Sequence, residues 1–347
     1  MFFTYNPFRP IGLKGFLMNK TLTKILALIL LITSVIGLCA CFEDIDNPKG
    51  SSSVVTGTEE KSFKRLSFDY SLYPYFATLT EKEKDIYSLL FEELYKGSQK
   101  FECRVEANAD DLSKSIDAVL NDHPELFWLD NKYSYTYDPD DGSIKEITFD
   151  FYDFADTPEK LHKAKVDMEA KADAVISEAR SKTTMVEREL CIHDYICQNT
   201  AYDEKAPYNQ SAYSCLILNK SVCAGYARAF QYLMSRAGFI CYYVAGRTEG
   251  LNGQVIGGSD ESGSHSWNMV LIEGSYYNVD CLWDDTASDT YGSAIYPFFN
   301  LTDEAFIYHV RNVMAAGLPK CNDTKYKYSN FFGKTVEAES IVFVDAA

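Results

Sequence analysis

The order of helix and strand patterns in residues 219–283 constrains the fold more than any other part of the chain. Residues 223–234 carry aromatic and leucine side chains at three- and four-residue steps, which predicts a helix with one apolar face. Residues 266–272 and 276–280 read as strands on either side of the turn signal at 273–275. The sequence therefore predicts a helix followed by an antiparallel hairpin.

Three residues of this segment have the side chains that nucleophilic acyl transfer requires. Cys223 stands at the predicted start of the helix, His265 where a Gly- and Ser-rich loop (253–263) meets the first strand, and Asp280 at the end of the second strand. A thiol, an imidazole and a carboxylate supply the attacker, its base and the group that orients the base. Antiparallel strands joined by a short turn are expected to place His265 and Asp280 near the same end of the hairpin.

Cys223 taken alone favours a structural role, because free cysteine is among the most buried residue types and is usually inert. Its predicted place in a first helical turn points the other way. The positive end of the macrodipole and the unpaired N–H groups there favour a thiolate and could receive an oxyanion. The presence of His265 and Asp280, each in a suitable local setting, shifts the balance to the catalytic interpretation.

The motifs around these residues strongly resemble those of the transglutaminase-like superfamily, in particular its bacterial surface members. They read Val-Cys-x-Gly-Tyr-Ala from residue 222, His-x-Trp-Asn from residue 265, and Tyr-x-Val-Asp-x-x-Trp-Asp-Asp from residue 277. The resemblance covers roughly residues 185–332. One departure is Ser266, where alanine is commoner, and both residues are small.

The resemblance implies a papain-like α+β fold with Cys223 as nucleophile, His265 as base and Asp280 as the residue that orients the base. It implies acyl transfer from a protein or peptide amide, either to water, as in a peptidase or deamidase, or to an amine, as in a transglutaminase. A binding or adhesion module that keeps the fold without catalysis is the rival hypothesis. A papain-type protease proper fits less well, because that family places its cysteine near the mature N-terminus, whereas Cys223 lies late in this chain.

Three aromatic residues near the motifs are candidates for lining a substrate groove, namely Trp267, Trp283 and Tyr226. Structural packing is the default interpretation of such residues. The sequence shows no paired Cys-x-x-Cys or His-x-x-x-His pattern, so neither a metal site nor a cofactor is expected.

The N-terminal part predicts export and lipid anchoring. A short basic region from Met18 precedes the mostly apolar stretch 25–36, and Leu-Cys-Ala-Cys ends at Cys41, the residue expected to be lipidated after cleavage of a signal peptide (1–41). Met18 alone would start a normal signal, so the true start is Met1 or Met18. An uncleaved membrane anchor is the alternative. Either interpretation places the folded part at the extracellular face of a bacterial membrane.

Charge and cysteine usage agree with an exported protein. The chain has 33 basic and 50 acidic residues, a formal net charge of −17, and loss of the leader makes it more negative. Such a surface disfavours nucleic acid and anionic lipid and would favour basic or neutral polypeptide partners. The resemblance implies an extracellular protein or peptide as the substrate, and the membrane is expected to be contacted through the anchor. Eight cysteines follow Cys41, and reserving Cys223 as a thiol leaves an odd number, so a full disulfide framework is not expected.

The length of the mature chain predicts two folded parts. A flexible tether (42–59) leads to a small α/β accessory domain (60–155), which contains two helices and a hairpin. A linker helix (156–181) then precedes the transglutaminase-like domain (182–333), and the C-terminal tail (334–347) follows.

Overall fold

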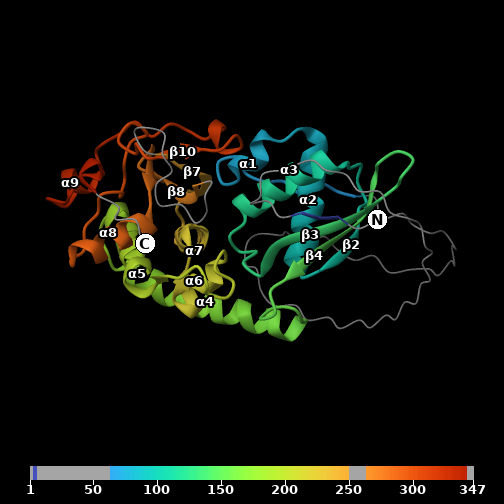
Figure 1. The fold of residues 1–347 in the computed structure, drawn as a ribbon, viewed down its shortest axis with the longest axis horizontal. Coiled ribbons are helices and arrows are strands. Elements are labelled where there is room, and N and C mark those ends of the chain that lie inside the picture. Colours follow the sequence, from blue (N-terminus) through green and yellow to red (C-terminus); the bar gives the residue numbers. More distant parts are fainter. Residues whose placement is uncertain (1–2, 6–62, 250–262, 342–347) are drawn as a thin grey trace, which may run out of the picture. The chain divides into compact units, whose positions relative to one another are not determined.

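The computed structural model describes residues 3–5, 63–249 and 263–341 (Figure 1). The predicted signal peptide, except for residues 3–5, the tether, Cys41 and most of the predicted loop 253–263 therefore lie outside the described residues. The described residues from Arg65 onward belong to one compact unit. No helix among the described residues combines the length and the apolar composition that crossing a membrane requires.

The described residues form two four-stranded sheets. The first lies in the N-terminal part and is antiparallel throughout, with strand order β1-β3-β4-β2. Its strands are β1 (Phe3–Tyr5), β2 (Lys100–Glu102), β3 (Leu129–Tyr137) and β4 (Ile144–Phe151). The helices of this part are α1 (Pro74–Thr78), α2 (Glu81–Lys96) and α3 (Ala109–Asp122). The predicted hairpin is confirmed as β3 and β4. At the start of α2, Thr80 and Glu83 form a complete capping box.

The helix α4 (Pro158–Arg180) follows the first sheet, as predicted. Thr157 caps it by accepting a hydrogen bond from the backbone N–H of Lys160, and Pro158 occupies the first turn, where its missing N–H costs nothing. Its buried residues form one stripe of mostly small and aliphatic side chains, so one face packs inward while the other carries charged groups.

The second sheet is antiparallel, with strand order β10-β7-β8-β9. Its strands are β7 (Cys241–Thr248), β8 (Ser264–Ile272), β9 (Ser275–Val279) and β10 (His309–Arg311). The turn between β8 and β9 contains Glu273 and Gly274, both with positive φ, and two such residues in succession match the twist of a tight hairpin. The hairpin predicted at 266–280 is thus confirmed.

Helices pack against this sheet and complete the α+β arrangement predicted from the sequence. They are α5 (Met185–Asn199), α6 (Ala212–Leu218), α7 (Cys223–Arg236) and α8 (Cys281–Tyr291). The shorter elements are β5 (Ala201–Tyr202) and β6 (Lys220–Ser221), which pair in parallel, η1 (Ala315–Gly317), α9 (Tyr328–Phe331) and η2 (Ala338–Ser340).

Direct hydrogen bonds join the N-terminal part to the helix and sheet that follow. Arg228 and Gln231 of α7 donate to the backbone carbonyls of Leu120 and Asn121 in the last turn of α3, the second at 2.9 Å. The hydroxyl of Tyr75 donates to a carbonyl of β7 at 2.7 Å. The last carbonyls of a helix have no intrahelical partner, so α7 satisfies groups that α3 leaves free.

Candidate active site

The first turn of α7 holds Cys223, which is 5 % exposed. The turn can approach the preceding loop because residue 225 is glycine. A Cβ at Gly225 would lie 1.8 Å from Oγ of Ser221 and 2.7 Å from the carbonyl oxygen of Asn209. Ser221 donates a hydrogen bond to that same carbonyl at 2.6 Å, which fixes the loop against the helix start. The glycine of the Cys-x-Gly motif therefore has a packing role.

The imidazole of His265 lies near the start of β8 and meets Asp280 at the end of β9. Nε2 of His265 is 2.5 Å from Oδ2 of Asp280, and both side chains are buried. Asp280 is also the N-cap of α8, because its Oδ1 accepts a hydrogen bond from the backbone N–H of Trp283 at 3.0 Å. One carboxylate thus holds the imidazole and starts the next helix.

Electrostatic coupling favours a charged pair at this position. Burial alone lowers the pKa of His265, but the charge and hydrogen bond of Asp280, together with the Cys223 side chain, raise the pKa to about 10. Burial likewise raises the pKa of Asp280, yet the contacts with His265 and His309 hold it below its usual range. The Cys223 side chain is close enough to the imidazole to contribute to this rise in its pKa. Since Nε2 faces the carboxylate, Nδ1 is the nitrogen left for the thiol.

A second imidazole, outside the three catalytic candidates predicted from the sequence, contacts the same carboxylate. Nε2 of His309, at the start of β10, is 3.0 Å from Oδ2 of Asp280. His309 follows Asp280 by 29 residues and belongs to no motif with a metal or catalytic spacing. Its place is set by the pairing of β10 with β7, and a short strand of three residues gives little sequence signal.

His265, Asp280 and His309 place one ligand-type atom each within 4.8 Å of one another, a set of groups able to hold a metal ion. No motif in the sequence predicts this cluster, which forms only because distant segments meet at Asp280. Its geometry is too tight for a bound ion. Two ligands about 2 Å from a tetrahedral zinc lie about 3.3 Å apart. Nε2 of His265 and Oδ2 of Asp280 are separated by only 2.5 Å, which is the distance of a hydrogen bond and not that of two ligands on one ion.

The aromatic residues considered for groove lining are all buried. Trp267, Trp283 and Tyr226 are 1 %, 3 % and 1 % exposed. The ring of Trp283 lies 5.2 Å from that of His265, and the hydroxyl of Tyr226 is 2.7 Å from Oδ2 of Asp285. They pack beside or behind the catalytic candidates and provide almost no surface for a substrate, which corrects the groove-lining expectation. Large rings pack efficiently in the interior, so structural packing, the default interpretation, describes these three residues.

A second set of cysteine, histidine and carboxylate lies elsewhere in the domain. Nε2 of His193 is 3.0 Å from Oδ2 of Asp284, and Sγ of Cys197 lies 3.8 Å from both ring nitrogens of His193. The thiol of Cys197 donates to the carbonyl of Cys281 at 3.2 Å. Cys197 stands in the last turn of α5, where the helix dipole opposes a thiolate, and burial raises its thiol pKa well above the ordinary value. This set is therefore structural.

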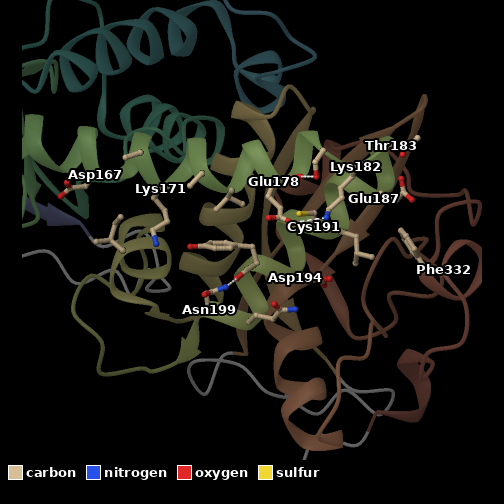
Figure 2. Close-up of a pocket in the computed structure, with 18 residues that line it drawn as sticks. Asp167, Lys171, Glu178, Lys182, Thr183, Glu187, Cys191, Asp194, Asn199 and Phe332 are labelled. Atoms are coloured by element: carbon tan, nitrogen blue, oxygen red, sulfur yellow. Dashed lines mark hydrogen bonds and ion pairs between the residues drawn. The ribbon is translucent and has the colours of Figure 1, made fainter.

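A cavity of about 1350 Å³ lies between α4 and α5 (Figure 2). Charged side chains line much of it, among them Asp167, Lys171, Glu178, Lys182 and Asp194. None of the three catalytic candidates lines this cavity, so it is separate from the site described above.

The eight cysteines of the described residues are all free, and they are Cys103, Cys191, Cys197, Cys215, Cys223, Cys241, Cys281 and Cys321. Burial raises the thiol pKa of several of them, including Cys215 and Cys321, each to about 12. Unlike these, Cys223 combines a helix N-terminus with an adjacent imidazole whose other nitrogen meets a carboxylate.

Comparison with known proteins finds similarity over this part of the chain. Residues 170–281 match the transglutaminase-like superfamily. A stretch of 199 residues is 29 % identical to kyphoscoliosis peptidase of Homo sapiens and covers 54 % of this chain and 29 % of that protein. The Mus musculus protein of the same name is 28 % identical over 188 residues, 52 % of this chain and 28 % of its own length. The chain thus spans less than a third of these curated relatives.

Two solved structures show weaker likeness. A TGase has a TM-score of 0.30 at 14 % identity, with 40 % of this chain and 41 % of that chain covered. The periplasmic domain of TgpA from Pseudomonas aeruginosa has a TM-score of 0.28 at 15 % identity, covering 33 % and 44 %. Residues 170–281 thus match the transglutaminase-like superfamily within an α+β structure, and the chain has a distant similarity to kyphoscoliosis peptidase.

Proposed function

We propose that the protein is a cysteine-dependent acyltransferase or hydrolase that acts on protein or peptide amides, with Cys223 as nucleophile, His265 as base and Asp280 as orienting residue. The observation that carries this proposal is the contact of His265 with Asp280 at 2.5 Å beside a cysteine in the first turn of a helix. The family match and the name of the curated relatives support the same class of chemistry.

The reaction would begin with the thiolate of Cys223 and the imidazolium of His265. The sulfur attacks the amide carbonyl, and its oxygen takes a negative charge that the free N–H groups at the start of α7 can stabilise. His265 then gives its proton to the leaving amine, the C–N bond breaks, and a thioester remains on Cys223. Water or a second amine attacks the thioester while His265 takes a proton, and the C–S bond breaks to restore the thiolate.

The choice between water and an amine as acceptor decides between a peptidase or deamidase and a transglutaminase. Peptides containing glutamine, with and without a lysine-like amine, separate these outcomes by mass. Deamidation, which releases ammonia, changes the mass by about +1 Da, amine transfer adds the mass of the amine less about 17 Da for the ammonia released, and backbone cleavage gives two fragments. The acidic surface favours basic or neutral polypeptides as partners.

We also propose that the protein is held at the outer face of a bacterial membrane by a lipid on Cys41. The support is the lipobox-like sequence Leu-Cys-Ala-Cys that follows a basic and an apolar region. Mass spectrometry of the mature N-terminus tests this: a diacylated Cys41 supports the anchor, and an unmodified Cys41 within an intact leader contradicts it.

The experiment that tests catalysis measures how fast iodoacetamide alkylates each cysteine of the full chain, purified in detergent, between pH 5 and 10. Selective labelling of Cys223 well below pH 8.5, lost in His265→Ala, is the expected result, because a thiol of ordinary pKa reacts slowly there. Labelling of Cys223 no faster than that of the other cysteines, and unaffected by the substitution, would refute the proposal and favour a binding module.

A further inference from the structure

We propose that His309 is a positioning residue of the active site: as a neutral imidazole it donates a hydrogen bond to Asp280 and thereby fixes the carboxylate that holds His265. This inference rests on the proposed acyl-transfer function. It concerns a residue outside the three that the sequence singles out.

The contacts of Asp280 show that its carboxylate is held at both oxygens. Oδ1 accepts the backbone N–H of Trp283 at 3.0 Å, and Oδ2 lies 3.0 Å from Nε2 of His309 and 2.5 Å from Nε2 of His265. With the two oxygens held from different elements, the carboxylate cannot rotate without breaking a buried hydrogen bond. Oδ2 therefore stays directed at His265.

The surroundings of His309 leave its ring a single orientation. The ring stacks on Phe306 with centroids 3.7 Å apart, and Trp283 and Trp267 lie at 4.4 and 4.9 Å. The backbone position is fixed by the pairing of His309 with Thr248 of β7. Aromatic walls offer no competing acceptor, so Asp280 is the hydrogen-bonding partner of Nε2.

The chemistry of the contact determines where the proton lies. An ionised carboxylate only accepts hydrogen bonds, so Nε2 of His309 carries the hydrogen. Nδ1 of His309 is buried and has no partner among the described residues. A proton on Nδ1 would leave a buried, unsatisfied charge, which is costly. The neutral tautomer protonated at Nε2 satisfies the site.

The titratable groups around Asp280 explain why one imidazole is charged and the other is neutral. His309 approaches from β10, His265 from β8 with Cys223 of α7 beyond it, and Asp284 and Cys281 act from α8 itself. Burial lowers the pKa of His309 to about 4, because the nearby charge of His265 offsets part of the attraction of Asp280. His265 takes the positive charge because it alone also contacts the thiol.

A neutral donor suits this position better than a charged one. A second imidazolium would neutralise Asp280 and weaken its hold on the charge of His265. A neutral N–H stabilises the carboxylate of Asp280 as an anion, and the negative charge remains to hold the imidazolium of His265. Without the donor, the pKa of Asp280 is expected to rise, and the active pair should then be lost at a higher pH during acidification.

The substitution test compares His309→Phe, which keeps an aromatic ring and removes the donor, with His309→Gln, whose amide N–H can occupy the place of Nε2. The readout is the pH dependence of Cys223 alkylation, and thermal unfolding checks that each variant is folded. We expect His309→Phe to lower the rate at neutral pH about tenfold or more, by analogy with other residues that orient a ligand from behind. The acid limb of the alkylation profile of His309→Phe should move to higher pH. His309→Gln should restore both the parent rate and the parent acid limb.

Two outcomes would overturn the proposal. One is a His309→Phe variant with the rate and pH profile of the parent protein. The other is a folded His309→Gln variant as impaired as His309→Phe, since that would assign the effect to ring packing. Absence of Cys223 reactivity in the parent protein would instead refute the proposed function.

A second measurement needs no activity. In the full chain labelled with ¹⁵N-histidine, the His309 signals, assigned by their loss in His309→Gln, should show a neutral ring protonated at Nε2 down to about pH 5. A ring protonated at Nδ1, or charged at pH 7, would refute the positioning role whether or not Cys223 reacts.

Discussion

Gly246 of β7 lies directly opposite His265 of β8 in the antiparallel register. A Cβ at this position would sit 2.2 Å from the carbonyl oxygen of Val310 and 2.6 Å from the indole of Trp267. The absence of a side chain therefore lets β10 and the indole of Trp267 pack closely against β7, the neighbour of the strand that carries His265. This glycine is part of the support of the site, although it bears no chemistry.

We expect Gly246→Ala to displace β10 or Trp267 and to lower the free energy of unfolding by about 1–3 kcal/mol, the usual cost of overpacking. Because His309 begins β10, Cys223 alkylation should slow as well. Gly317→Ala is the control, since a Cβ there meets only a methyl group of Thr78 at 4.0 Å. Equal unfolding midpoints in urea for both variants would contradict the packing argument.

Asp280→Asn tests the charge of the orienting residue while keeping its size. In the parent protein the charge and hydrogen bond of Asp280 outweigh the effect of burial and raise the pKa of His265 to about 10. Without that charge, the pKa of His265 should fall to or below the ordinary 6.5. The imidazolium then loses its proton at lower pH, and Cys223 alkylation near neutral pH should fall about 100-fold or more. The surface variant Asp173→Asn should keep the parent profile. If the alkaline limb of the Cys223 alkylation profile is unchanged in Asp280→Asn, Asp280 does not stabilise the positive charge on His265.

The sequence identifies the elements that carry the catalytic candidates because each has a strong local signal. The apolar period of α7 and the turn at Glu273 and Gly274 are readable within a few residues, and the hairpin brings His265 and Asp280 together. The two capping threonines, Thr80 and Thr157, likewise act locally.

The features that the sequence does not reveal depend on contacts between distant segments. His309 reaches Asp280 only because β10 pairs with β7, and His193 reaches Asp284 across 91 residues. The burial of Trp267 follows from the same pairing, since the space at Gly246 is defined by β10. No local pattern encodes these distances.

Cys197 provides a test of what distinguishes a nucleophile from a structural thiol. It lies near an imidazole that contacts a carboxylate, as Cys223 does, but burial raises its pKa and it stands at a helix C-terminus. Cys197→Ser should therefore leave the alkylation profile of the protein unchanged, whereas Cys223→Ser should abolish the fast phase. A fast phase that disappears in Cys197→Ser would reverse the assignment.

Glu189 of α5 should make the fold less stable as the pH rises. Its carboxyl is fully buried, with only Oε2 accepting from Asn300 at 2.9 Å, and burial raises the pKa to about 8. Between the unfolded pKa near 4.3 and about 8, the folded state holds a proton that the unfolded state has lost. The free energy of unfolding should then fall by up to ~1.4 kcal/mol per pH unit.

Glu189→Gln removes this titration while keeping the hydrogen bond to Asn300. We expect the variant to match the parent protein near pH 5 and to be more stable at pH 9, as measured by urea unfolding. Glu178→Gln on the exposed surface is the control and should not change the slope. A Glu189→Gln variant that is less stable than the parent at pH 9 would show that the carboxylate is needed.

Arg228 differs from Arg236 although both lie on α7. Arg228 is buried, donates to the carbonyl of Leu120 and lies 4.6 Å from the ring centre of Tyr243. Arg236 forms a surface ion pair with Asp173 at 3.2 Å. Arg228→Gln should lower the free energy of unfolding by about 2 kcal/mol, because a buried carbonyl loses a charged donor, and Arg236→Gln by less than about 1 kcal/mol. Similar losses of unfolding free energy in the two variants, measured by thermal or urea unfolding, would contradict this difference.

The carbonyls at the end of α3 are satisfied by α7, and α7 also begins with Cys223. Any residue at 120 and 121 supplies these backbone carbonyls, so α7 depends on where α3 ends and not on the side chains there. A chimera that takes the N-terminal part from one homologue and the catalytic part from another will fold well only if its α3 ends where the side chains of α7 can reach it. The unit that evolution can exchange intact is therefore larger than the segment that carries the nucleophile, the base and the carboxylate.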